Sequence, residues 1–179
     1  MASSNDASVV RGASAPRGSP IGFVVRLLLV LFCFYYAYTR VKHSQAFEAH
    51  REILAVVAAG LLRVFYRGVE QNGTMLSMPG PTSVDVGEGC DAIFPILCFV
   101  GGVLAFSAPL RAKLLGLLVG LGLIELLNVV RIASLLVILR HRPEWFHAAH
   151  TRVWETVFVL FSVSLWGIWA LRALRRDEP

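Results

Sequence analysis

The sequence predicts an all-α polytopic membrane protein with about five transmembrane helices and a short extracytoplasmic β-hairpin before the third main span. Composition is the first observation behind this prediction: of 179 residues, 56% are hydrophobic and only 16% are charged, and the mean hydropathy is +0.64. Soluble domains carry about a quarter charged residues, so this balance is typical of an integral membrane protein. Spans of about 20 residues each leave no room for a large extramembrane domain.

Long apolar runs are the second observation, and they place the spans. The predicted spans cover residues 21–38, 47–66, 92–108, 114–139 and 153–171. They make up a transmembrane domain over residues 21–176, between a disordered N-terminal tail, 1–20, and a C-terminal tail, 177–179. The second segment contains Arg63 and is either a span or an amphipathic interfacial helix; its length and apolarity favour a span.

The polar stretch over residues 68–89 has the alternating pattern of a hairpin. Four apolar residues alternate on either side of the turn at residues 79–81: Leu76, Met78, Val84 and Val86. This pattern predicts a short β-hairpin that leads directly to Cys90. Its edge is a candidate clamp that would bind an extended substrate motif as an added strand.

Basic residues indicate topology. The formal net charge is +5, but no basic stripe interleaved with aromatic residues is present, so we expect no nucleic-acid partner. Five basic residues mark one membrane face: Arg111, Lys113, Arg172, Arg175 and Arg176. The positive-inside rule makes this face cytoplasmic, although Arg140, Arg142 and Arg152 oppose it. We therefore expect a multi-pass protein of the cytoplasmic (inner) membrane whose polar pocket faces the non-cytoplasmic side.

Three ionisable residues lie in or beside apolar segments, where such side chains are costly and indicate function. Cys90 opens the third span, and His150 opens the fifth after two further crossings, so both lie on the same side. Arg131 lies in the fourth span, about 12 Å below that surface by helical rise. The sequence therefore predicts that these three residues converge in one shallow pocket.

A thiol, a guanidinium and an imidazole together are typical of acyl transfer. A cysteine at a helix N-terminus is a candidate nucleophile, and a nearby histidine is a candidate base. Arg131 and Asn128 lie one turn apart and could both donate to a developing oxyanion. Structural alternatives stay open: Cys90 as a small buried hydrophobe, Arg131 as a partner of Glu125, and His147 in place of His150.

Other classes of function leave different signatures. The three cysteines form no C-x-x-C pair and have no Cys/His ligand spacing, so we expect neither a metal nor a cofactor. The alternative to an enzyme is a non-enzymatic membrane scaffold or small transporter that uses Arg131 and Glu125. That alternative predicts that Glu125→Gln abolishes function while Cys90→Ala retains it.

Three motifs resemble a known family. Glu88-Gly-Cys-Asp-Ala-Ile, Leu127-Asn-Val-Val-Arg-Ile-Ala-Ser and Trp145-Phe-His-Ala-Ala-His-Thr-Arg-Val-Trp resemble the exosortase/archaeosortase family, most closely its compact H-type exosortases. The resemblance covers residue 54 to the C-terminus. It implies the following site: Cys90 as nucleophile, Arg131 as stabilising arginine, His150 as third catalytic residue and Asn128 in support. One departure is Asp91-Ala92, where the family often has a small residue.

The resemblance also implies a reaction and its partners. It implies a membrane-embedded cysteine protease or transpeptidase that processes the C-terminal sorting signal of exported proteins through a thioester. Such substrates carry a short motif, a transmembrane helix and a basic cluster, and they reach the enzyme within the membrane lipid. The thioester would pass to water or to a glycan or lipid acceptor, so hydrolysis and transfer both remain open.

Overall fold

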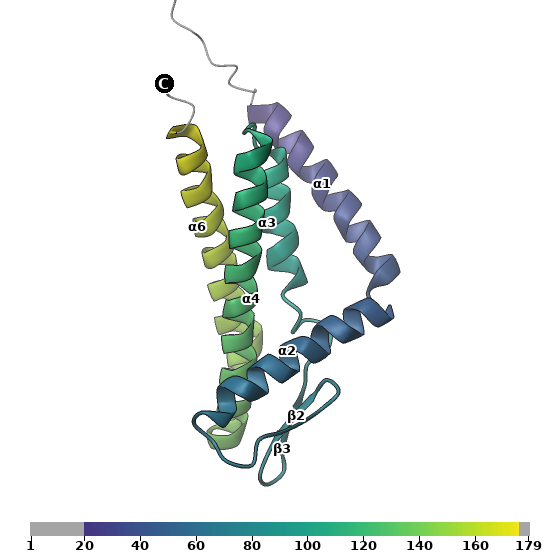
Figure 1. Cartoon of the computed structure of the whole chain (residues 1–179), viewed down its shortest axis with the longest axis vertical. Helices are drawn as coiled ribbons and strands as arrows, with labels where there is room; N and C mark the ends of the chain where they lie inside the picture. Colours follow the sequence, from purple (N-terminus) through teal and green to yellow (C-terminus); the bar gives the residue numbers. More distant parts are fainter. Residues whose placement is uncertain (1–19, 176–179) are drawn as a thin grey trace, which may run out of the picture.

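The computed structural model describes residues 20–175, which form a helical molecule with a small sheet at one end (Figure 1). In chain order the elements are α1 (Pro20–Val41), α2 (Gln45–Arg63), β1 (Glu70–Asn72), β2 (Met75–Met78), β3 (Thr82–Asp85), α3 (Ile93–Ala105), α4 (Leu110–His141), α5 (Pro143–Ala148), the π-helical turn η1 (Ala149–Val153) and α6 (Trp154–Arg175). The tails predicted over residues 1–20 and 177–179 lie outside the described residues, except for Pro20, which begins α1.

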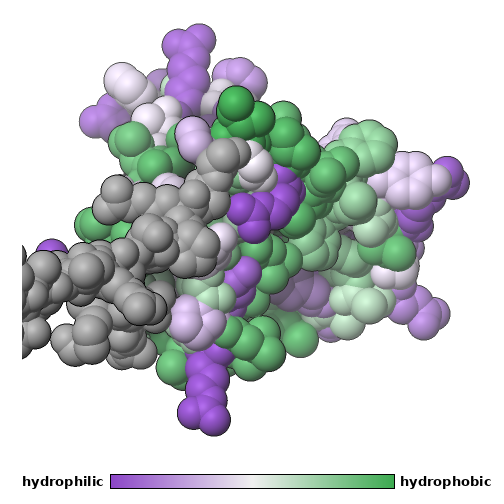
Figure 2. Space-filling model, turned by 90° about the horizontal axis from the view of Figure 1, so that it is seen from above, coloured by the Kyte–Doolittle hydropathy of each residue, from purple (hydrophilic) through white to green (hydrophobic). Residues whose placement is uncertain are grey.

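Three helices among the described residues are long and apolar enough to cross a membrane, fewer than the five or so expected. They are Pro20–Val41, Leu110–His141 and the continuous helical run Pro143–Arg175. The helix α3 is apolar but has only 13 residues. Seen from above, apolar side chains (green) lie between protruding hydrophilic ones (purple) (Figure 2). Many large apolar side chains of α1, α4 and α6 are exposed, as a lipid-facing surface requires.

The helix α2 differs from the favoured expectation of a span over residues 47–66. It is not among the candidate spans, and it lies across the lower end of α3 and α4 beside the sheet (Figure 1). Its first half carries Glu48, Arg51 and Glu52, which hydrocarbon would not solvate. This arrangement corresponds to the interfacial alternative.

The sheet is a three-stranded antiparallel meander in which β2 pairs with both neighbours. The predicted hairpin is confirmed in β2 and β3, where Leu76 lies opposite Val84. The turn between these strands contains Gly80, whose φ of 100° favours glycine. The strand β1 was not predicted, because its sequence, Glu-Gln-Asn, has no apolar alternation.

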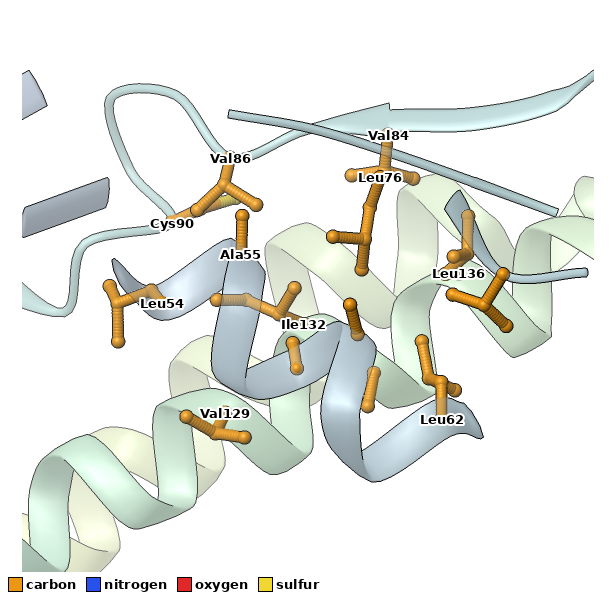
Figure 3. Close-up of a cluster of buried hydrophobic side chains, with 14 of the residues drawn as sticks. Leu54, Ala55, Leu62, Leu76, Val84, Val86, Cys90, Val129, Ile132 and Leu136 are labelled. Atoms are coloured by element: carbon orange, nitrogen blue, oxygen red, sulfur yellow. The ribbon is translucent and has the colours of Figure 1, made fainter. Parts of the chain in front are cut away.

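A buried apolar cluster joins α2, the sheet and the lower half of α4 (Figure 3). The side chains of Ala55, Ala58 and Ala59 are fully buried, and their small size lets α2 approach α4 closely. Leu76 from the sheet and Ile132 from α4 lie in the same cluster. Cys90 is also a member, so this core fixes the segment that carries the thiol.

A second cluster packs α3, α4 and α6 against one another. Phe99, Ile124 and Phe158 are its buried members from the three helices. Glycines on α4 make room for aromatic rings, because a Cβ on Gly120 would collide with the Phe99 ring. The two clusters together place the beginnings of α3 and α6 beside the lower half of α4.

The connection between α4 and α6, which lies between two of the predicted spans, is helical. The helix α5 begins with Pro143, whose fixed φ suits a first helical turn, and η1 continues directly into α6. The π-helical turn contains His150 and lies next to α4. Such turns are rare and occur frequently at functional sites.

We predict that Gly120→Ala destabilises the protein by about 1–3 kcal/mol, because the Phe99 ring has to leave its place in a packed core. Gly122→Ala is the matched control on the same helix, since a Cβ there meets nothing within 4 Å. Thermal unfolding of the detergent-solubilised variants measures the difference. Equal unfolding midpoints for the two variants would contradict the packing described for α3 and α4.

Candidate active site

The segment that carries Cys90 makes a sharp turn between β3 and α3. Gly89 has a φ of 88°, and Ala92 adopts the left-handed conformation with a φ of 50°, which is uncommon for a residue with a side chain. The backbone N–H of Cys90 donates to the carbonyl of Gly87 at 3.0 Å. The turn leaves Cys90 only 7% exposed, immediately before α3 begins.

Two side chains of α4 hold this turn by its carbonyl oxygens. Asn128 Nδ2 donates to the carbonyl of Cys90, and Arg131 Nη1 donates to that of Gly89, each at 2.8 Å. Asn128 and Arg131 lie three residues apart, so they share one face of the helix. Both donors were expected to point towards an oxyanion. The structure shows the amide of Asn128 engaged with the backbone of the Cys90 segment instead.

His150 completes the cluster from η1. Its Nε2 lies 3.6 Å from Cys90 Sγ and 3.3 Å from Arg131 Nη2. The predicted convergence of Cys90, Arg131 and His150 is therefore confirmed. Because a guanidinium only donates hydrogen bonds, Nε2 acts as the acceptor from Arg131, and the ring proton of this tautomer lies on Nδ1.

Aromatic rings fix the two partners of the thiol. The ring of Phe146 stacks on that of His150, with centroids 6.0 Å apart and an interplanar angle of 14°. The guanidinium of Arg131 lies 5.5 Å from the centroid of Phe158. Sequence analysis identified neither phenylalanine, because both belong to ordinary apolar helical patterns.

The structure also shows where two of the residues named in the structural alternatives lie. His150, rather than His147, brings its ring to Cys90 and Arg131. Glu125 does not pair with Arg131: its Oε1 lies 3.3 Å from His50 Nε2. Six residues along a helix separate Glu125 and Arg131 by about 120°, which accounts for this difference.

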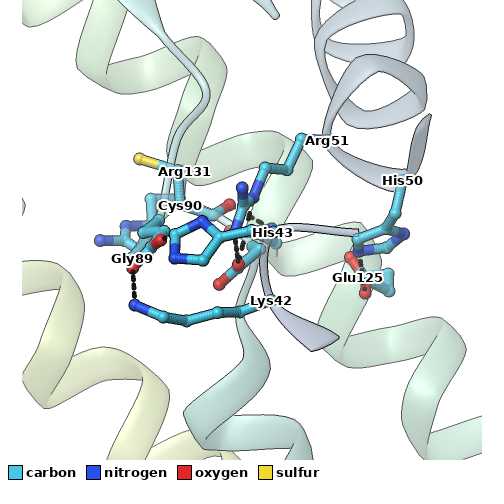
Figure 4. Close-up of polar contacts among 11 residues, drawn as sticks. Lys42, His43, His50, Arg51, Gly89, Cys90, Glu125 and Arg131 are labelled. Carbon is cyan, nitrogen blue, oxygen red and sulfur yellow. Dashed lines mark hydrogen bonds and ion pairs between the residues drawn. The ribbon is translucent and has the colours of Figure 1, made fainter. Parts of the chain in front are cut away.

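A buried ion pair adjacent to Cys90 was not predicted. Arg51 of α2 reaches Asp91 Oδ2 with Nη2 at 3.1 Å and Nε at 3.3 Å (Figure 4). The two residues are 7% and 1% exposed. Arg51 lies in the predicted second segment, and no partner for it follows from the sequence. No local pattern links it to Asp91, which lies 40 residues further along the chain.

Burial raises the pKa of the Cys90 thiol, and the neighbouring Asp91 carboxylate raises it further, whereas the Arg131 guanidinium acts in the opposite direction. The helix N-terminus was expected to favour the thiolate, but desolvation of the sulfur is the larger effect. The resting thiol is therefore protonated near neutral pH. Nucleophilic attack then requires a proton acceptor, and Nε2 of His150 lies 3.6 Å from the Cys90 sulfur.

Two mainly apolar cavities lie away from the thiol. One, of about 300 Å³, lies between α4 and α6, and the other, of about 270 Å³, lies among α1, α3 and α6. Within residues 20–175, no three His, Cys, Asp or Glu side chains are grouped as a metal site would require.

Fold and site together define a multi-pass membrane protein whose cysteine, arginine and histidine meet at one end of its helices. The family described as transmembrane exosortase (Exosortase_EpsH) matches residues 17–170 of the chain. The protein therefore belongs to the exosortase family, which consists of cysteine transpeptidases. Neither the curated proteins nor the solved structures include a significant match.

We predict that alkylation of Cys90 by iodoacetamide has its midpoint at a higher pH than alkylation of N-acetylcysteine, because burial disfavours the thiolate. Replacing Arg131 by Gln should move the midpoint higher still, since the nearby positive charge is lost. Mass spectrometry of the Cys90 peptide, in a Cys33→Ser, Cys98→Ser background, follows the reaction. A midpoint at or below that of the free thiol contradicts the electrostatics described here.

Proposed function

We propose that this exosortase is a membrane-embedded cysteine protease or transpeptidase that processes the C-terminal sorting signals of exported proteins. Cys90, Arg131 and His150 form its catalytic triad. One observation carries the proposal: a single imidazole nitrogen lies 3.6 Å from the thiol sulfur and 3.3 Å from a guanidinium nitrogen, so its lone pair is within reach of both. Acyl transfer by a protonated thiol needs a base and an oxyanion donor in this proximity.

The first step couples proton transfer to oxyanion stabilisation. His150 Nε2 takes the proton of the Cys90 thiol while the sulfur attacks the scissile carbonyl carbon. Once protonated, Nε2 no longer accepts the hydrogen bond from Arg131 Nη2. That N–H is then free to donate to the oxyanion of the tetrahedral intermediate, whereas Nη1 continues to hold Gly89.

Collapse of the intermediate forms the thioester. The C–N bond breaks, the leaving amine takes the proton from His150, and the acyl group stays on Cys90. His150 again has a free Nε2, which deprotonates the incoming nucleophile. That nucleophile is water in a hydrolysis, or an amine or hydroxyl of an acceptor in a transfer.

The sidedness of the reaction follows from the charges. Exposed Arg172 and Arg175 end α6 at the end of the molecule opposite the sheet (Figure 1). By the positive-inside rule we assign that end to the cytoplasm and the Cys90 end to the non-cytoplasmic side. The free edge of β3, a few residues before Cys90, is our candidate for binding the extended sorting motif.

Cys90→Ala should abolish processing of a co-expressed reporter that carries a C-terminal motif, a transmembrane helix and a basic cluster, because no thioester can form. Cys98→Ala is the matched control, since Cys98 is exposed on α3 away from the cluster. Immunoblotting of the reporter in membranes, with enzyme abundance measured in parallel, gives the readout. Unchanged processing by an abundant Cys90→Ala protein would refute the proposed function.

His150→Ala should lower the processing rate by about 10²–10⁴-fold, the range typical of a lost general acid–base group. His147→Ala removes a neighbouring imidazole of the same size and should keep the rate within about threefold, since it leaves Nε2 of His150 in place. A time course with the same reporter compares the two. If His147→Ala lowers the processing rate as much as His150→Ala or more, the role of general acid–base is not specific to His150.

A further inference from the structure

The segment around Cys90 is held by two helices. From α4, Arg131 and Asn128 bind the carbonyls of Gly89 and Cys90. From α2, Arg51 binds the carboxylate of Asp91, the residue that follows the nucleophile. Figure 4 shows Arg51 reaching from α2 towards this segment.

A buried ion pair is energetically costly in this position. Both partners are almost completely buried, and desolvating two charges offsets most of the Coulombic attraction between them. Apolar residues of similar volume often serve stability as well or better. Asp91 also lies beside a thiol that must ionise, so an unpaired carboxylate there would oppose the chemistry. Arg51 removes that conflict while it fixes the carboxylate with two N–H donors.

We propose that Arg51 and Asp91 are positioning residues of the active site: their ion pair holds the Cys90 turn against α4 and neutralises the carboxylate beside the nucleophile. The proposal rests on the proposed function for its catalytic meaning. Arg51 and Asp91 act through the placement and the ionisation of the Cys90 sulfur.

Charged and titratable groups around the sulfur come from each neighbouring element. They are Arg131 from α4, His150 from η1, Arg51 from α2, Asp85 from β3 and the adjacent Asp91. Of these, Arg51 lowers and Asp91 raises the pKa of the Cys90 thiol. The two halves of the pair should therefore shift thiol ionisation in opposite directions, whereas a loss of packing would shift it in the same direction in both variants.

The test measures alkylation and processing in the same variants of the full chain. Arg51→Met leaves Asp91 unpaired and should slow alkylation of Cys90 near neutral pH; Asp91→Asn leaves Arg51 unpaired and should accelerate it. Both should lower processing of the reporter by at least about tenfold, because small displacements of a nucleophile are costly. If Asp91→Asn makes the Cys90 thiol more reactive but lowers processing of the reporter, the loss comes from a misplaced sulfur and not from a less ionised one.

Two further variants separate charge and geometry from folding. Arg51→Lys keeps the charge but loses the planar two-donor fork, so it should restore the alkylation profile and only part of the processing. His50→Gln is the matched control, because it breaks the adjacent ion pair of α2, with Glu125, without touching the Cys90 turn. It should keep both readouts within about twofold of wild type, as expected for a half-exposed pair.

Opposite shifts in alkylation together with reduced processing support the proposal. It is overturned if Arg51→Met and Asp91→Asn shift alkylation in the same direction, or if both process the reporter at close to the wild-type rate. Alkylation needs no substrate, so it tests the ion pair even when the wild-type protein leaves the reporter intact. That last result would count against the proposed function alone.

Discussion

Two hydrogen bonds from α4 to the backbone of the Cys90 turn are the constraint on which the site depends. Asn128 and Arg131 donate to the carbonyls of two successive residues in one short turn, and the same guanidinium contacts His150. A single helical face therefore sets the positions of the Cys90 turn and the His150 imidazole together. The apolar cluster beneath the sheet keeps α4 and the turn in contact, so packing and polar geometry support one another.

Burial of the thiol has a cost that the rest of the site offsets. An apolar setting excludes water from a thioester but disfavours the thiolate. The structure places an acceptor nitrogen next to the sulfur and a guanidinium next to both. It also balances Asp91 with Arg51, so the carboxylate does not stand alone beside the sulfur. The cluster of Cys90, Arg131 and His150 and the ion pair thus belong to one electrostatic arrangement built by α2, α4 and η1.

The sequence predicts those features that depend on local pattern and on the energetic cost of charged side chains in a membrane. That cost singled out Cys90, Arg131 and His150, and the order of the spans placed them on one side. The hairpin β2–β3 follows from the alternation of apolar and polar residues. Features set by tertiary contacts were missed. The helix α2 packs against α4 and the sheet instead of crossing the membrane. The polar strand β1 forms only by pairing with β2. Arg51 and Asp91, 40 residues apart, come together only through tertiary packing.

The most direct measurement is the mass of the Cys90 peptide from enzyme incubated with reporter and quenched at short times. If the thiol, imidazole and guanidinium act together as described, this peptide carries the acyl portion of the substrate in a linkage that hydroxylamine cleaves. Product that accumulates while Cys90 stays unmodified, and that still forms after Cys90 has been alkylated, would contradict the account.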